Sequence, residues 1–224
     1  MKQKITKIFT TTNDKNIAYH VNDDKASVNS ARKNIALKYN FDINNLKYMK
    51  QIHGNDVQIV SQEQNLYECD ALVSNIKNSS LMVMVADCIP ILFEDSTNGI
   101  IGVAHAGRNG TFLNISSNVI YTMMEKFSSN IENIKVNLGA SIQKCCYEVS
   151  MDLANITSKN FGNEFVKHRF IDLQGINQKQ LLDIGILQEN ITISNICTKC
   201  GDDPYFSYRL DKYCGRFAGI IILQ

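Results

Sequence analysis

Three short apolar runs dominate the hydrophobic pattern of the chain. They lie close together, at 81–86, 89–93 and 100–104. A nearly continuous apolar run of this length is typical of a strand that is buried on both faces. Turn residues separate the runs, with Asp-Cys-Ile-Pro after the first and Glu-Asp-Ser-Thr-Asn-Gly after the second. The pattern therefore predicts three buried strands, with Asp87 and Cys88 at the end of the first and His105 at the end of the third.

The rest of the chain alternates between helical and strand-like patterns. Apolar residues recur at helical spacing in 24–40, with Asp24 as the expected cap, and in 112–127, with Thr111 as the expected cap. Further helices are expected at 151–161 and 177–184. The remaining expected strands lie at 46–49, 57–60, 71–74, 134–138, 191–196 and 216–223. Because strands and helices interleave without a linker or a repeat, the expected fold is α/β (α+β), a single domain over 1–224 with a mixed β-sheet and flanking helices.

Composition and charge narrow the classes of partner. The 224 residues carry a net charge of +1 without a dominant Lys/Arg cluster, so neither nucleic acid nor an anionic membrane surface is an expected partner. No apolar segment has transmembrane length, and the first residues lack the apolar core of a signal peptide. Seven cysteines, an odd number, fit reduced thiols better than a disulfide framework. We expect a cytoplasmic protein that acts on small molecules as a monomer or weak oligomer.

Histidine and cysteine residues beside the apolar runs are the candidates for chemistry. His53 and His105 each lie in a Gly-containing turn next to an apolar strand, and Cys88 is the third candidate. Two imidazoles and one thiolate suit zinc, and three protein ligands leave a fourth position open for water or substrate. The three residues are far apart in the chain, so only the fold could bring them together. The spacing leaves open an alternative in which the histidines bond to their turns and Cys88 is a small buried residue.

The other cysteines carry weaker signals. Cys197 and Cys200 form a CxxC pair, which is found in zinc ribbons and in redox dithiols. However, there is no second CxxC to complete a four-cysteine site, and no thioredoxin-like βαβ context precedes the pair. The adjacent Cys145 and Cys146 are more typical of buried packing than of a vicinal disulfide. We therefore leave the pair at 197 and 200 unassigned.

Five motifs in a fixed order carry a resemblance over most of the chain. They are Gln-Ile-His-Gly at 51–54, Ala-Asp-Cys-Ile-Pro at 86–90, Ala-His-Ala-Gly at 104–107, Cys-Tyr-Glu-Val at 146–149 and Phe-Ser-Tyr-Arg at 206–209. In these motifs the chain resembles the YfiH family of laccase-domain proteins, long labelled polyphenol oxidases and now linked to purine nucleoside phosphorylase activity. The resemblance implies a zinc-dependent enzyme in which His53, Cys88 and His105 hold the metal and form the catalytic centre. Cu²⁺ is the alternative metal.

The resemblance also implies a set of reactions. Family members are described as phosphorolysing adenosine, inosine, guanosine and S-methyl-5'-thioadenosine to the base and ribose or methylthioribose 1-phosphate, and as deaminating adenosine. Some members are tied to editing of peptidoglycan precursors. The pattern alone would leave Arg32 solvated on its helix, whereas the resemblance suggests a role in holding phosphate. The expected substrate- and phosphate-binding residues are Arg32, Gln51, Arg108, Asn109, Tyr208 and Arg209.

One motif departs from the family pattern. The family usually has Ala-His-Ala-Gly-Trp-Arg-Gly, whereas this chain has Ala-His-Ala-Gly-Arg-Asn-Gly. Asn109 offers no charge where the family has an arginine, which would weaken anion binding. Arg108, one residue earlier, is the candidate to replace that charge with a shifted geometry.

Other classes of function compete for the same residues. Cys88 as a nucleophile with His105 as its base would make a metal-free thiol hydrolase. A copper-dependent polyphenol oxidase ranks lower, because a full laccase needs many more histidines than the four present. A binding module without catalysis would tolerate loss of Cys88. Asp87 is not assigned as a general base, because strand alternation would point its side chain away from that of Cys88.

Overall fold

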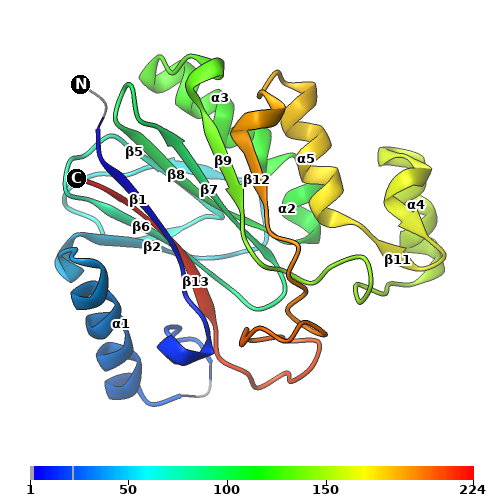
Figure 1. Ribbon diagram of the computed structural model, residues 1–224, viewed down its shortest axis with the longest axis horizontal. Coiled ribbons are helices and arrows are strands. Elements are labelled where there is room, and N and C mark those ends of the chain that lie inside the picture. Colours follow the sequence, from blue (N-terminus) through cyan, green and yellow to red (C-terminus); the bar gives the residue numbers. More distant parts are fainter. Residues whose placement is uncertain (1–2, 22) are drawn as a thin grey trace.

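Two β-sheets packed face to face make up the centre of the protein in a computed structural model that describes residues 3–21 and 23–224 (Figure 1). The five-stranded sheet has the order β1 (Ile5–Phe9), β13 (Phe217–Leu223), β6 (Ser80–Val85), β2 (Leu46–Lys50) and β4 (Leu66–Glu68). The six-stranded sheet has the order β12 (Ile191–Ile193), β9 (Lys135–Leu138), β7 (Ile89–Asp95), β8 (Ile100–Ala106), β5 (Ala71–Ser74) and β3 (Val57–Ile59). Both sheets mix parallel and antiparallel pairs.

The apolar runs are continuous because both faces of these strands are covered. In β6, Leu81 and Val83 belong to the core between the sheets, together with Val103 of β8. The alternate residues Met82 and Met84 lie on the opposite face, in the core formed with α1 (Lys25–Tyr39). A strand in a middle layer has no solvent face, so its sequence does not alternate between apolar and polar residues.

The outer face of the six-stranded sheet is covered by α3 (Ile115–Phe127) and α5 (Leu173–Asp183). Phe93 of β7 is fully buried in this core with Val119 of α3 and Ile176 of α5. The fold is therefore four layers deep, with α1 on one side and α3 and α5 on the other (Figure 1).

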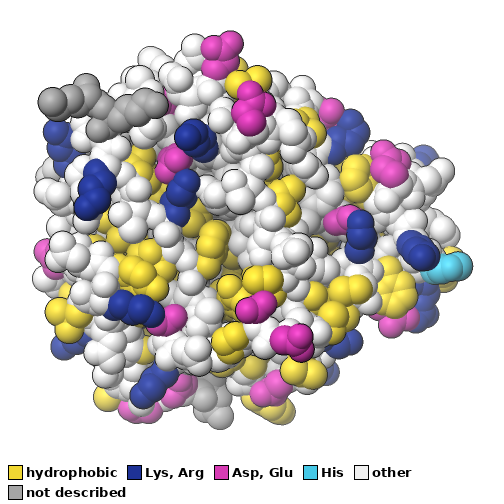
Figure 2. All heavy atoms as spheres, in the orientation of Figure 1, with side chains coloured by type: hydrophobic (Ala, Val, Ile, Leu, Met, Phe, Trp, Pro, Cys, Tyr) yellow, Lys and Arg dark blue, Asp and Glu magenta, His cyan; other side chains and the backbone are white. Residues whose placement is uncertain are grey.

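Smaller elements complete the chain. They are α2 (Arg108–Phe112), α4 (Met151–Phe161), the hairpin β10 (Val166–Lys167) and β11 (Phe170–Ile171), and the 3-10 helices η1 (Thr12–Asp14), η2 (Ile43–Asn45), η3 (Ile131–Asn133), η4 (Asn163–Phe165) and η5 (Gln188–Asn190). Within 3–21 and 23–224, no helix combines the length and apolar character needed to cross a membrane. On the face drawn in Figure 2, acidic and basic side chains are interspersed.

The predicted α/β class with flanking helices is confirmed, although the strands form two mixed sheets instead of one. The three apolar runs form β6, β7 and β8, and the predicted helices at 24–40 and 151–161 form α1 and α4. Asp24 caps α1 as expected, because its side chain accepts a hydrogen bond from the backbone N–H of Ser27.

Several boundaries differ from the prediction, most of them by one or two residues. Thr111 does not cap a helix over 112–127, because it lies inside α2, and Asn114 precedes α3 in a left-handed conformation. The Thr111 hydroxyl is buried and accepts a hydrogen bond from the Asn177 side chain at 2.9 Å. The helix expected at 177–184 begins at Leu173, because Asp172 supplies its cap. The strand expected at 191–196 ends at Ile193. The strands β1, β4, β10 and β11 were not predicted.

Candidate metal centre

Three chain segments converge at one end of the two-sheet sandwich. His105 lies in β8 opposite Pro90 of β7, and Cys88 immediately precedes β7. Asp70 immediately precedes β5, and its backbone carbonyl accepts a hydrogen bond from the His105 backbone N–H at 2.8 Å. Pairing of β5, β7 and β8 thus fixes Asp70, Cys88 and His105 beside one another.

A buried carboxylate holds the loop that carries His53. This loop joins β2 to β3, and His53 has a φ of 60°, in the left-handed region. The Asp70 carboxylate accepts backbone hydrogen bonds from Ile52, His53 and Gly54, at 3.2, 3.0 and 2.6 Å. Three convergent N–H groups on one carboxylate offset the strained conformation of a non-glycine residue.

The same carboxylate orients the second histidine. His105 Nδ1 lies 2.8 Å from Asp70 Oδ1, and both side chains are buried. Burial opposes ionisation of Asp70, but His105 and the loop N–H groups outweigh it and lower the pKa of Asp70. With Nδ1 occupied, Nε2 of His105 is the nitrogen available to a metal, which is the arrangement in which metal-binding histidines usually occur.

The donor atoms of His53, Cys88 and His105 all lie within 4.8 Å of one another. The two imidazole rings meet edge to face, with centroids 4.8 Å apart and an interplanar angle of 84°. A zinc ion bound by one sulfur at about 2.3 Å and two nitrogens at about 2.0 Å requires donor atoms that lie within a few ångströms of one another, as these do. Donor type, donor spacing and the oriented histidine therefore fit a zinc ion with an open fourth position.

The electrostatics of the cluster favour a thiolate. Burial raises the pKa of Cys88, but His105 and His53 outweigh that effect, so the pKa of Cys88 lies below its ordinary value. Burial lowers the pKa of His105, whereas Cys88 and Asp70 raise it above its ordinary value. Without a cation between them, Cys88 and His105 would form a thiolate–imidazolium pair, and a thiolate is also the form of cysteine that binds metal.

Two glycines after β8 are required by close approaches to the cluster. A Cβ at Gly107 would lie 3.0 Å from the Cys88 sulfur. A Cβ at Gly110 would lie 3.0 Å from the His105 carbonyl oxygen and 3.1 Å from that of Gly54. These glycines let α2 begin directly against the cluster.

Two members of the cluster, His53 and Cys88, line a cavity of about 250 Å³, and the buried His105 lies beside them. Aromatic rings and guanidinium groups form part of its wall, which provides surfaces for a flat base and for an anion. The residues lining it are His53, Ala86, Asp87, Cys88, Arg108, Asn109, Tyr147, Tyr208 and Arg209.

Comparison with known proteins adds to this geometry. Residues 7–224 match the model of the family described as multi-copper polyphenol oxidoreductase laccase. The chain belongs to this family. It is the one whose motifs the sequence analysis identified as those of YfiH-type laccase-domain proteins.

Named relatives of this laccase-domain chain agree with the assignment. Purine nucleoside phosphorylase YlmD from Bacillus subtilis (strain 168) is 32% identical over 214 residues, which cover 88% of this chain and 77% of the relative. Adenosine deaminase RL5 from an unknown prokaryotic organism is 31% identical over 225 residues, covering 92% and 86%. The crystal structure of hypothetical protein YfiH from Bacillus licheniformis superposes with a TM-score of 0.89 at 26% identity, covering 98% and 93%.

The departure from the family motif lies in the cavity wall of this laccase-domain chain. Arg108 and Asn109 are both exposed and both line the cavity. The Arg108 guanidinium donates two hydrogen bonds to the Asn109 side-chain oxygen, from Nε at 3.1 Å and Nη2 at 2.9 Å. Asn109 therefore holds Arg108 at the mouth of the cavity, although it carries no charge of its own.

Arg32 and Gln51 are not among the residues that line this cavity in the described chain. The expectation of a solvated Arg32 is wrong, because Arg32 is only 5% exposed and lies between the rings of Tyr19 and Tyr48, at 4.2 and 4.4 Å from their centroids. The Gln51 side chain bonds to the backbone N–H and carbonyl of Met84. Their roles in phosphate binding stay predictions.

No local motif marks Asp70, so the sequence does not predict its role. Tyr147 lies within the Cys-Tyr-Glu-Val motif, but its place in the cavity wall was not predicted. Asp87 does line the cavity, because its φ of 84° breaks the strand alternation. Its carboxylate accepts hydrogen bonds from the Thr198 hydroxyl and the Arg209 backbone N–H, both at 2.7 Å. Asp87 therefore positions the loop of Arg209, and the structure gives no reason to make it a general base.

Proposed function

We propose that this protein is a zinc-dependent purine nucleoside phosphorylase that also deaminates adenosine. The observation that carries the proposal is the cluster of His53, Cys88 and His105, two of which line a cavity together with tyrosines and arginines. The names of the relatives YlmD and RL5 support the two activities. The proposed substrates are adenosine, inosine, guanosine and S-methyl-5'-thioadenosine, and the proposed setting is a cytoplasmic monomer or weak oligomer.

In phosphorolysis, a phosphate oxygen forms a bond to the anomeric carbon of the ribose while the bond to the purine nitrogen breaks, and the purine leaves with a proton. A bound zinc ion would supply a Lewis acid that neutralises negative charge at the centre. Asp70 keeps His105 in one tautomer, and the exposed guanidinium of Arg108 offers charge to the phosphate.

The remaining wall suits the nucleoside. Tyr147 and Tyr208 both line the cavity, and aromatic rings offer a flat apolar surface for a purine. The Arg209 guanidinium lies 5.0 Å from the Tyr147 ring centroid and donates a hydrogen bond to the Glu148 carbonyl at 2.9 Å. This contact joins the loops that carry the two tyrosines, so the binding surface is held in place before substrate arrives.

The test is to incubate the purified protein with inosine, with and without phosphate, and to follow hypoxanthine and ribose 1-phosphate. We expect hypoxanthine release that depends on phosphate, with the sugar phosphate formed in equal amount. Adenosine in parallel should also yield ammonia. Protein that retains zinc but releases no base from any purine nucleoside would refute the proposal and favour the peptidoglycan-precursor hydrolase alternative.

A metal-free thiol hydrolase uses the same residues and is favoured by their electrostatics, because each of Cys88 and His105 shifts the pKa of the other toward the charged form. Turnover that survives a chelator and is abolished by alkylation would identify it. A copper-dependent polyphenol oxidase would instead show oxygen-dependent oxidation of phenols.

Replacement of Arg108 should identify the phosphate subsite. A charge-assisted hydrogen bond contributes about 1.5 kcal/mol at an exposed position, so we expect Arg108→Ala to raise the KM for phosphate roughly tenfold. The KM for inosine should change much less. Lys126→Ala removes an exposed cation from α3, away from the cavity, and should leave both values unchanged. Equal phosphate KM values for the three proteins would place the phosphate elsewhere.

A further inference from the structure

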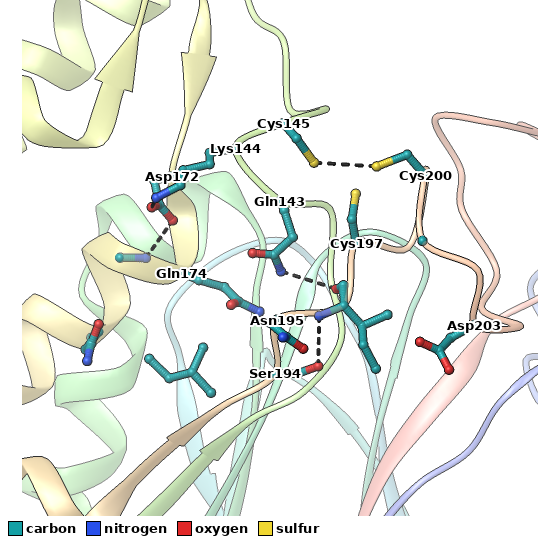
Figure 3. A pocket seen from close by; sticks show the side chains of 15 residues that line it. Gln143, Lys144, Cys145, Asp172, Gln174, Ser194, Asn195, Cys197, Cys200 and Asp203 are labelled. Carbon is teal, nitrogen blue, oxygen red and sulfur yellow. Dashed lines mark hydrogen bonds and ion pairs between the residues drawn. The ribbon is translucent and has the colours of Figure 1, made fainter.

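Four cysteines from two loops meet outside the site described above. We call Cys145, Cys146, Cys197 and Cys200 the cysteine cluster. Their sulfur atoms all lie within 4.8 Å of one another, and those of Cys145 and Cys200 are 3.6 Å apart. Figure 3 shows the side chains of Cys145, Cys197 and Cys200 pointing toward one another at the edge of a surface cavity of about 730 Å³.

The cluster corrects two expectations from the sequence. A second CxxC is not needed, because the adjacent Cys145 and Cys146 follow β9 and supply the other two sulfurs. Buried packing does not explain this pair either, since Cys145 is exposed and Cys146 only partly buried. The two pairs are about 50 residues apart in sequence and meet because β12 pairs in parallel with β9, which brings the ends of both strands to the same side.

The turn at Cys197 holds the two cysteines of the CxxC pair close together. The turn closes tightly, with the Gly201 N–H bonded to the Cys197 carbonyl at 2.8 Å. A Cβ at Gly201 would lie 2.6 Å from that oxygen, so only glycine fits there. The tight turn therefore fixes the spacing of Cys197 and Cys200, two of the four sulfurs that meet here.

The sulfur spacing distinguishes a metal site from a disulfide. A tetrahedral zinc ion with four sulfurs at about 2.3 Å places them about 3.8 Å apart, close to the observed 3.6 Å. A disulfide requires about 2.05 Å and would use only two of the four sulfurs. All seven cysteines of the chain are free thiols in the structure. Four soft thiolates select zinc over the hard cations.

We propose that the cysteine cluster binds a second zinc ion, separate from the one at His53, Cys88 and His105. Four Zn–S bonds form, and the thiol protons pass to the solvent. Because all four positions are taken by protein, this ion has no open site and plays a structural part.

The position of the cluster gives this ion a consequence for the cavity. Tyr147, which lines the cavity, directly follows Cys146. Thr198, which lies between Cys197 and Cys200, donates the hydrogen bond to Asp87 at the cavity wall. Zinc at the cysteine cluster would therefore hold together the loop that carries Tyr147 and the loop that carries Thr198, and both loops support the cavity wall.

Zinc content per chain tests the proposal without any assay of activity. The protein is purified under reducing conditions with Zn²⁺, and bound zinc is counted by native mass spectrometry and elemental analysis. We expect about two zinc ions in the unmodified chain and about one each in Cys88→Ala and in Cys197→Ser/Cys200→Ser. Cys214→Ser changes a cysteine that belongs to neither group and should keep two.

Two results would overturn the proposal. One is a Cys197→Ser/Cys200→Ser protein with native circular dichroism that holds as much zinc as the unmodified chain. The other is a Cys88→Ala protein, in which all four cluster cysteines remain, that holds no zinc and whose cluster thiols all react freely with iodoacetamide. The Cys88→Ala protein decides the matter even where the double variant fails to fold. A cobalt-loaded Cys88→Ala protein should also show sulfur-to-metal charge-transfer absorption, and absence of that band would contradict four-sulfur ligation.

Discussion

Cys88→Ala should abolish phosphate-dependent release of hypoxanthine from inosine, with a fall of more than about 100-fold in kcat/KM. The sulfur of Cys88 is one of three donors within 4.8 Å of one another, and it is the only anionic one. Its loss leaves two imidazoles, which would hold zinc weakly. The measurement is base release under saturating phosphate, together with the zinc content of the same samples.

Cys214→Ala is the matched control for that experiment, since it removes a partly buried cysteine that belongs to neither metal-ligand group. It should retain activity close to that of the unmodified protein. Cys88→Ala protein with native circular dichroism and undiminished phosphorolysis would contradict the proposed role of the cluster. Chelator treatment of the unmodified protein separates the remaining alternatives, because a thiol nucleophile would keep working after zinc is removed.

Asp70→Asn should weaken zinc binding and kcat/KM by roughly 10- to 100-fold, although Asp70 itself does not line the cavity. One carboxylate both bonds to Nδ1 of His105 and accepts three backbone N–H groups from the loop of His53. An asparagine removes the negative charge, and its amide N–H groups would face the N–H donors that now bond to the Asp70 carboxylate. Both histidines should therefore lose their fixed orientation in a single substitution.

Asp95→Asn offers a comparison at a similar buried carboxylate. Asp95 is fully buried and accepts backbone hydrogen bonds from Thr97 and Asn98 in the turn between β7 and β8. Its replacement should lower the thermal stability while the affinity for zinc stays the same. Titration of zinc into both variants checks this, and equal affinities for Asp70→Asn and the unmodified chain would rule out the positioning role of Asp70.

The local pattern of the sequence was enough to locate most elements, because strands of a middle layer are apolar along their whole length. Only tertiary contacts show that these strands form two stacked sheets. Thr111 is an example of the same limit. A threonine before an apolar helical pattern is a reasonable cap. In the structure, however, its hydroxyl is fully buried and bonded to Asn177 of α5, 66 residues away, and the local sequence does not indicate this contact.

The candidate metal centre could be predicted from residue types, because the chain has few histidines and two of them lie beside strands. The role of Asp70 could not be predicted from the sequence, because a carboxylate that orients another ligand has no characteristic spacing. Arg32 shows the converse error. Its helical position suggested a solvated side chain, yet Tyr19 and Tyr48 enclose its guanidinium from outside the helix. The cysteine cluster remained hidden because its halves meet only through β9 and β12.

The position of β13 in the five-stranded sheet constrains the order in which the chain can fold. This strand lies between β1 and β6, with Ile8 opposite Ile220 and Val83 opposite Gly219, so it joins the first strand of the fold to one from the middle of the chain. During synthesis, β13 is made after the other four strands of this sheet. Until then β1 and β6 lack their common partner, and the backbone edge of β6 that pairs with β13 stays open. Completion of this sheet therefore waits for synthesis of β13, and chains that stop before Phe217 expose an aggregation-prone edge.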